Sequence, residues 1–324
     1  MNFASASRAA SHAAQRRRPV DLRSMLPVIS LFAVLVPMAI VQPNTVSYFG
    51  GVMLLNLGIP IVFATLAQLS VITANELDLS IGSFVSLVAC IGGTLLQSSP
   101  WLGWGALAGC IVVYALVGAL IEYRRISSVV VTLGLSFVWN GIAVLLLPAP
   151  GGQAPEWLAS LMSFHMPVVP APLVWTAAIA LCTHLFFMRS ALGVRLRGVG
   201  GNAGAMHRFG WSIIRSKALL FGCAGLFGVC SGLTLLGLTT SADANIALRY
   251  TLLSVAGVIL GGGEFTGGRV SPVGAVLGAI TLTLASSFLS FLQVAPEWQI
   301  GLQGAILIAV LSLRLVFRLK EPRR

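Results

Sequence analysis

The sequence predicts an all-α fold: a polytopic helical membrane protein with about ten transmembrane helices. Hydrophobic residues make up 57% of the 324 positions and charged residues only 9%, and the mean hydropathy is +0.93, far more apolar than in a chain whose surface faces water. Apolar runs of about 20 residues, the length that a bilayer requires of a helix, recur along the chain. These runs lack the period-two alternation of barrel strands, so helices are expected.

The predicted spans are the longest apolar runs, separated by polar or glycine-rich stretches. They cover residues 26–42, 50–72, 81–98, 102–121, 127–147, 171–188, 217–238, 250–263, 271–292 and 298–316. No stretch between them is long and polar enough to fold as a separate soluble domain. The expected organisation is a single membrane domain over residues 26–316, preceded by a basic tail at 1–25 and followed by a second basic tail at 317–324.

Basic residues predict the orientation, because Lys and Arg are retained on the cytoplasmic side of a membrane. With the N-terminus inside, 19 of the 20 Lys and Arg residues fall in the two tails, in the even-numbered loops or, for Lys217 and Arg314, at the cytoplasmic ends of predicted spans, and Arg249 is the exception. Both termini and residues 189–217 are therefore expected in the cytoplasm, and residues 149–170 outside, as an interfacial helix. The net charge of +11 then reflects topology, and no nucleic-acid partner is expected because the charge is divided among several segments.

Residue types that carry catalysis are not arranged for it. The five cysteines fall inside predicted spans without a CxxC pair, and the four histidines have no metal-ligand spacing. The glycine clusters between residues 260 and 268 lack the Lys-Ser/Thr ending of a phosphate-binding loop. We therefore expect no metal, no cofactor, no ATP site and no enzymatic activity in this chain.

Residues 189–217 form the longest and most basic predicted loop. Within it, the sequence NAGAMHRFGWSII predicts a short helix that begins with Asn202 as its N-cap and breaks at Gly210. The residues alone leave two interpretations open. The loop is either held by anionic lipid headgroups or is a docking element for a cytoplasmic partner.

Two acidic residues stand close together between the second and third predicted spans, in TANELDLSIGS at residues 73–83. Asp78 or Ser80 would cap the helix that follows, and the helix dipole would favour the charge of Asp78. Alternatively, the segment is irregular backbone that lines a cavity, since non-helical chain at membrane depth persists only where protein or water satisfies it. The two interpretations are compatible.

Four segments occur in order along the chain: ELDLSIGS (76–83), GVGGNAGAMHRFG (198–210), VAGVILGGGEFTGGRVSPVGAVLGA (255–279) and QIGLQGAILIAV (299–310). Together they resemble the permease subunit of bacterial ABC importers of the ribose and monosaccharide type, over roughly residues 50 to 316. The resemblance implies a multi-pass subunit of the bacterial inner membrane that translocates a small sugar. It also implies an ATP-hydrolysing partner subunit, a periplasmic solute-binding protein, and a permease homodimer or a heterodimer with a close paralogue.

The resemblance favours the docking interpretation of residues 189–217. In that family the loop with an Asn-x-x-Ala-type helix contacts the ATPase, and the helix here carries the candidate coupling residues Asn202, Ala203, Ala205, His207 and Gly210. The family's usual acidic residue after the Asn is absent, since Ala203 and Gly204 follow it. The family pattern also places Gly-Gly-Ile where this chain has Asn75, Glu76 and Leu77, so Glu76 is a departure.

Candidate residues for a substrate pathway or gate are polar or aromatic positions on the second and fifth predicted spans and the segment after the second. They are Gln68, Thr73, Asn75, Asp78, Phe137 and Asn140. The alternative role for such residues is interhelical hydrogen bonding and packing. Two other functions remain open: a branched-chain amino-acid-type ABC permease, and an ion-coupled secondary carrier, which would need paired ionisable residues deep in the spans.

Overall fold

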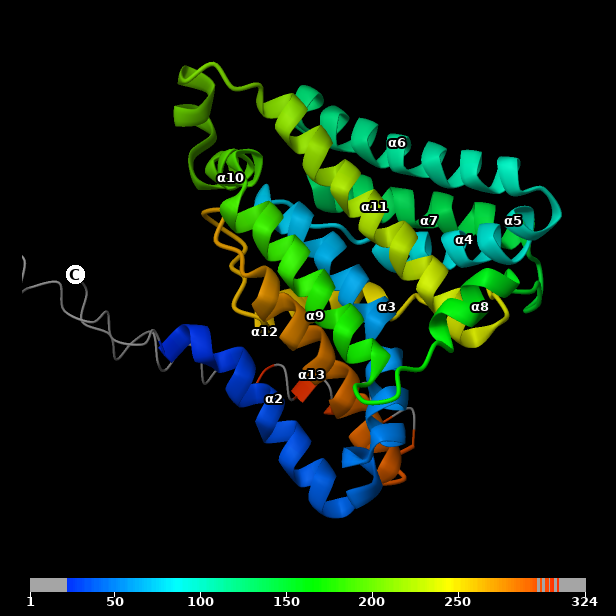
Figure 1. Cartoon of the computed structure of the whole chain (residues 1–324). Coiled ribbons are helices and arrows are strands. Elements are labelled where there is room, and N and C mark those ends of the chain that lie inside the picture. The colour runs from blue at the N-terminus through cyan, green and yellow to red at the C-terminus, as the bar shows by residue number, and fades with distance from the viewer. Residues whose placement is uncertain (1–21, 296–297, 299–300, 303, 306–307, 309–324) are drawn as a thin grey trace, which may run out of the picture.

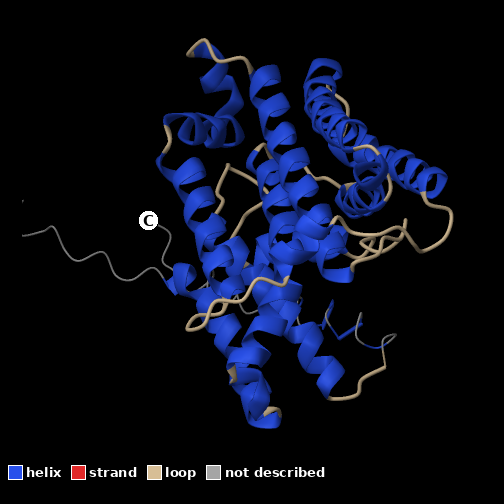
Figure 2. Ribbon diagram, turned by 45° about the vertical axis from the view of Figure 1, so that its right-hand side comes forward, coloured by secondary structure: helices blue, strands red, loops and turns tan. Residues whose placement is uncertain are grey.

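The computed structural model describes residues 22–295, together with 298, 301–302, 304–305 and 308. Every regular element in this part of the chain is a helix (Figure 2), and β-type pairing is limited there to an isolated bridge between Gly151 and Ala242. The all-α prediction is confirmed. The tail at 317–324, most of the tail at 1–25 and most of the predicted span at 298–316 lie outside the described residues.

The elements follow one another with short connections. They are α2 (Leu22–Val41), η1 (Pro43–Val46), α3 (Tyr48–Thr73), α4 (Ile81–Gly93), α5 (Leu95–Ser98), α6 (Pro100–Arg124), α7 (Ser128–Leu146), α8 (Glu156–Met162), α9 (Ala171–His184), the π-helix η2 (Leu185–Arg189), α10 (Ala191–Arg208), α11 (Ile213–Thr239), α12 (Tyr250–Leu260) and α13 (Pro272–Phe291). The predicted interfacial helix of the 149–170 segment corresponds to α8.

Seven helical segments of the described chain are long and apolar enough to cross a membrane. Two shorter apolar helices, Met25–Val41 and Tyr250–Leu260, complete the set. These segments coincide with the first nine predicted spans, with edges that differ by a few residues. The protein is therefore a multi-span helical membrane protein. The total of about ten spans stays a prediction, because the tenth lies mostly outside the described residues.

Helix α4 lies at the centre of the bundle, and all 13 of its residues are buried. It packs against α11, α7 and α12. Helix α11 approaches it closely at Gly232, where an added Cβ would lie only 2.5 Å from the Cβ of Val88. Small residues permit such close approach in membrane proteins, where helix association depends on packing rather than on a hydrophobic driving force.

Helices α6 and α7 expose much of their apolar surface. Leu116 is 63% exposed, Val130 68% and Leu145 83%. In a membrane protein, faces of this kind are covered by lipid or by another subunit.

The two ends of the bundle differ in charge. At one end lie α10, the C-terminal ends of α3 and α6, and the beginning of α11 (Figure 1). We call it the basic end, defined by Arg124, Arg125, Arg189, Arg195, Arg197, Arg208, Arg215, Lys217 and Arg269. At the opposite end, α8 and the segments 147–155 and 240–249 cover the C-terminal end of α4, where Gln153 N donates to Gly93 O at 3.1 Å.

Candidate functional site at the basic end of the bundle

Helix α10 consists of two helices joined at Asn202, whose backbone (φ −157°, ψ 88°) is not helical. The Asn202 side chain accepts a hydrogen bond from Ala205 N at 2.9 Å, which is the geometry of an N-cap. The second helix ends at Gly210, where φ is +81°. There Gly210 N donates to His207 O and Trp211 N donates to Met206 O, as in a Schellman motif. The predicted helix from Asn202 to Gly210 is confirmed, and a helix over 191–201 precedes it.

This short helix, residues 203–208, is presented to solvent. Ala203, Gly204 and His207 are exposed, and Ala205 is half-buried. Phe209, at the end of the helix, is 80% exposed. The sequence-based candidates omit Phe209 because they emphasise small residues. The signal is nevertheless present: a large aromatic residue directly before the helix-breaking glycine of a polar loop.

The first helix of α10 is held by contacts to Trp211 and to η2, and these contacts fix the position from which the short helix starts. The Arg195 guanidinium lies 4.4 Å from the centre of the Trp211 ring, a cation–π contact between the two sides of the short helix. Arg197 Nε donates to Phe187 O in η2 at 2.9 Å. The segments before and after the short helix are thus held together by a side-chain contact within the protein.

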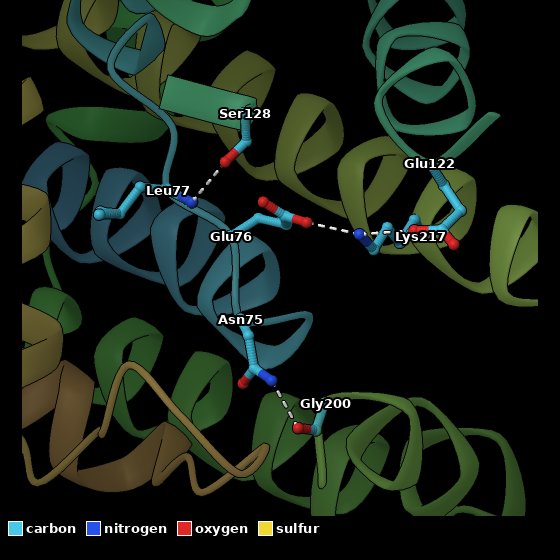
Figure 3. Close-up of polar contacts among 7 residues, drawn as sticks. All are labelled: Asn75, Glu76, Leu77, Glu122, Ser128, Gly200 and Lys217. Carbon is cyan, nitrogen blue, oxygen red and sulfur yellow. Dashed lines mark hydrogen bonds and ion pairs between the residues drawn. The ribbon is translucent and has the colours of Figure 1, made fainter. Parts of the chain in front are cut away.

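The end of α3 packs directly against α10. At Gly200 an added Cβ would lie 2.0 Å from Thr73 O and 3.0 Å from Gly268 Cα, so only glycine fits without displacement. Asn75 Nδ2 donates to Gly200 O at 2.6 Å (Figure 3). Asn75 Oδ1 accepts from Gly268 N at 3.4 Å. Asn75 has φ +60°, a conformation that favours Gly and that Asn tolerates better than most residues. A glycine, which the resemblance to the permease family implies at this position, would adopt this φ without strain.

Glu76 points to the other side of the segment, toward α11 (Figure 3). The Lys217 ammonium lies between two carboxylates, 2.5 Å from Glu76 Oε1 and 2.8 Å from Glu122 Oε2. The three side chains are 13 to 27% exposed. Partial burial of this kind reduces solvent screening, so the pairs are stronger than ion pairs on an open surface.

The middle of the segment is bound to α7. Leu77 N donates to Ser128 Oγ at 3.3 Å, and Leu79 N donates to Thr132 Oγ1 at 3.0 Å. These bonds satisfy backbone groups that leave the helical pattern, as chain at membrane depth requires. The prediction of irregular backbone is confirmed for residues 74–80, where protein groups satisfy the chain. That this segment lines a cavity stays a prediction.

Asp78 is buried and hydrogen-bonded. Its Oδ1 accepts from Ser80 N (2.7 Å) and Ser80 Oγ (2.6 Å), and its Oδ2 accepts from Tyr114 Oη (2.9 Å). Burial raises the pKa of the Asp78 carboxyl above its ordinary value, and the bonds from Ser80 and Tyr114 partly offset this. The prediction that Asp78 or Ser80 caps α4 is wrong in detail. Ser80 makes no capping bond, Asp78 binds the residue before the helix, and Gly82 N inside α4 donates to Thr251 Oγ1.

The candidate pathway residues do not gather in one place. The Gln68 amide is oriented so that its nitrogen donates to Asp78 O at 3.0 Å and its oxygen accepts from Asp78 N at 3.3 Å. Thr73 is buried and donates to Leu69 O, close to Asn75. On α7, Phe137 is 71% exposed, and Asn140 binds Ala244 O and Asn245 Oδ1 toward the opposite end.

A cleft of about 670 Å³ opens beside the first helix of α10. It lies between α2, α10 and the segment 261–271, and its charged lining residues are Arg197, Glu264 and Arg269. Arg269 and Glu264 approach to 3.7 Å. Helix α12 ends at Leu260 and α13 begins at Pro272, so the eighth predicted span, 250–263, ends three residues earlier than expected.

The fold and this site define a class of protein: a multi-span membrane subunit that presents a short, capped, exposed helix at its basic end. Residues 50–311 match the family model described as the branched-chain amino acid transport system / permease component. Because the match covers most of the chain, the protein belongs to this permease family, whose members are membrane subunits of transporters.

Curated relatives align over most of their length. The galactose/methyl galactoside import permease protein MglC of Haemophilus influenzae is 25% identical over 262 residues, covering 73% of this chain and 77% of the relative. The autoinducer 2 import system permease protein LsrC of Klebsiella pneumoniae is 29% identical over 308 residues, covering 90% and 86%. The probable ABC transporter permease protein y4mJ of Sinorhizobium fredii is 26% identical over 289 residues, covering 87% and 85%. No solved structure matches significantly. The resemblance to ABC permeases is thus confirmed.

Proposed function

We propose that this protein is the permease subunit of an ABC importer that carries a small sugar across the bacterial inner membrane, with ATP hydrolysed by a separate subunit. The observation that carries the proposal is the exposed helix 203–208, capped at both ends, in a bundle of the permease family. The sugar specificity rests on similarity to permeases named for galactose and methyl galactoside import, and on the sugar-type motif at residues 76–83.

The alternatives have less support. A branched-chain amino-acid permease shares the family description, but the relatives compared above carry other substrate names or none. An ion-coupled carrier needs ionisable pairs deep within its helices. Among the described residues, the ion pairs Glu76–Lys217–Glu122 and Glu264–Arg269 all belong to the basic end.

In the proposed assembly the basic end and both termini face the cytoplasm, and residues 26–316 form one membrane domain between the tails 1–25 and 317–324. The helix with Asn202, Ala203, Ala205, His207 and Gly210 docks on the ATPase, and Phe209 adds an aromatic contact. A solute-binding protein delivers the substrate at the opposite end. A second permease, identical or a close paralogue, covers part of the exposed faces of α6 and α7. The candidate residues for a substrate path or gate stay Gln68, Thr73, Asn75, Asp78, Phe137 and Asn140; they lie in separate places, and Asn75 is assigned to a gate and not to a contact with the substrate.

The first test asks whether ATP hydrolysis requires a separate subunit. We expect purified permease in proteoliposomes to hydrolyse no ATP, because its glycine clusters lack the lysine of a phosphate-binding loop. Adding the ATPase subunit and the loaded binding protein is expected to produce both ATP hydrolysis and uptake of labelled sugar. ATP hydrolysis by the permease alone would contradict the proposal, and a proton or sodium gradient that drives uptake without ATP would favour the carrier.

The orientation gives the second test. In a background without the five native cysteines, Ala203→Cys is expected to react with an impermeant thiol reagent only after the cytoplasmic side is opened. Phe164→Cys, half-exposed in the segment beside α8, is expected to react from outside in intact cells. The reason is the retention of basic segments in the cytoplasm. The reverse labelling pattern would overturn the topology.

A further inference from the structure

Residues 74–80 connect α10 and α11, which flank the proposed docking helix 203–208, to the other helices of the bundle. On one side, Asn75 binds Gly200 of α10 and Glu76 binds Lys217 of α11. Gly200 lies two residues before the N-cap of the docking helix, and Lys217 lies in the first turns of the helix that follows it. Asn75 and Glu76 therefore bind one residue before the docking helix, Gly200, and one residue after it, Lys217.

On the other side, the same segment binds the helices that surround α4. Leu77 and Leu79 donate to hydroxyls of α7. Asp78 accepts from Tyr114 of α6 and pairs with Gln68 of α3. Helix α4, which is buried along its whole length, begins at Ile81, directly after the segment. A displacement of residues 74–80 must therefore shift the start of α4 and the bonds to its neighbours.

We propose that residues 74–80 are a mechanical relay between the ATPase-docking helix and the central helices, and that Asn75 and Glu76 are its positioning residues. This inference rests on the proposed docking of an ATPase at residues 203–208. Asn75 transmits movement of α10, and the Glu76–Lys217 ion pair transmits movement of α11. Neither residue contacts the substrate in this role; both act by fixing the segment that α4 follows. The two ties are short polar contacts between partners 125 and 141 residues apart in the chain.

The two carboxylates on Lys217 offer a matched pair of variants. Glu122 joins α6 to α11, and these helices already pack closely: a Cβ on Gly118 of α6 would lie 2.7 Å from Lys217 O. Glu76 instead joins α11 to the relay. Glu76→Gln and Glu122→Gln each remove one charge, and each leaves Lys217 with one carboxylate. Neither variant leaves an unpaired buried charge, so both are expected to fold.

A second variant tests the α10 tie. Asn75→Gly removes the amide that binds Gly200 and Gly268, and glycine adopts the φ of +60° at this position without strain. The backbone conformation is thereby kept while the tie is cut. An alanine at position 75 would be a poorer choice, because it would add strain to the loss of the amide.

The experiment uses the full complex of permease, ATPase subunit and binding protein in proteoliposomes, with radiolabelled D-ribose or D-galactose, whichever the unmodified complex takes up. The quantities measured are the ATPase bound per permease and the sugar transported per ATP hydrolysed. All three variants are expected to retain the ATPase. Glu76→Gln and Asn75→Gly are expected to lower the sugar transported per ATP by about fivefold or more, and Glu122→Gln to leave that ratio unchanged.

Other outcomes overturn the relay in distinguishable ways. A wild-type ratio in Glu76→Gln and Asn75→Gly would show that the ties carry no movement. An equal loss in Glu76→Gln and Glu122→Gln would show that the ion pairs serve only to hold the helices together. Loss of the ATPase from Glu76→Gln would place Glu76 in the docking surface instead. If the unmodified permease fails to bind any ATPase, the proposed function fails, and this is measured separately from the variants.

Discussion

Replacing Phe209 with Asp is expected to release the ATPase subunit and to abolish sugar uptake. Phe209 is 80% exposed in this chain, at the tip of a helix that we propose inserts into the ATPase. Burying an aromatic ring contributes roughly 2 to 3 kcal/mol, and a carboxylate in the same place would be desolvated without a partner. The affinity for the ATPase is therefore expected to fall by about a hundredfold or more, measured by co-purification and by titration in detergent.

Because Phe209 is exposed, this test separates ATPase binding from folding. A side chain that touches little of its own chain contributes little to folding, so the variant is expected to insert and to unfold at the wild-type temperature. Phe209→Leu, which keeps an apolar side chain, is the matched control and is expected to retain most of the binding. Normal ATPase binding by Phe209→Asp would contradict the docking role of residues 202–210 and favour the interpretation of a basic loop held by lipid headgroups.

Replacing Gly200 with Ala is expected to destabilise the protein strongly. The added methyl would lie 2.0 Å from Thr73 O and 3.0 Å from Gly268 Cα, and both obstacles are backbone atoms that cannot rotate away. Relieving the clash requires α10 to move off the end of α3, which would break the hydrogen bonds of Asn75. We expect a cost of about 3 kcal/mol and a thermal unfolding temperature lower by roughly 5 to 10 °C, followed by fluorescence in detergent.

Gly204, in the second helix of α10, provides the control. A Cβ there meets Asn202 Oδ1 at 3.6 Å, an ordinary contact, and alanine favours helix by roughly 1 kcal/mol relative to glycine. Gly204→Ala is therefore expected to leave the unfolding temperature unchanged or slightly raised. Equal unfolding temperatures of Gly200→Ala and Gly204→Ala would show that α10 does not pack tightly on α3 in solution.

The spans and the docking helix are predictable because they depend on residues close together in the sequence. A transmembrane helix requires a run of apolar residues as long as the bilayer is thick, so the predicted spans match α3, α6 and α11 within a few residues. The cap at Asn202 and the break at Gly210 follow from a side chain and a backbone preference that act within one helical turn. The excess of basic residues near 189–217 likewise distinguishes one loop from the others by composition alone.

The partners of residues 74–80 could not be predicted, because they lie far away in the sequence. Local rules suggest Asp78 or Ser80 as a helix cap and place both acids in a segment expected to line a cavity, without assigning a partner to either. The fold separates them: Glu76 turns outward to Lys217, 141 residues away, and Asp78 turns inward to Tyr114, 36 residues away. Nothing in the spacing of the two acids indicates which way each side chain faces.

The sequence by itself determined that this chain crosses a membrane repeatedly as helices, and that one polar loop carries a capped helix, since length, apolarity and capping are local properties. Only the tertiary structure decided that Asn75 and Glu76 tie this loop to the bundle while Phe209 stays exposed. The physical reason is that hydrogen bonds and ion pairs are formed by atoms a few ångströms apart. Which atoms meet at that distance depends on how whole helices pack, through contacts such as Gly200 against Thr73.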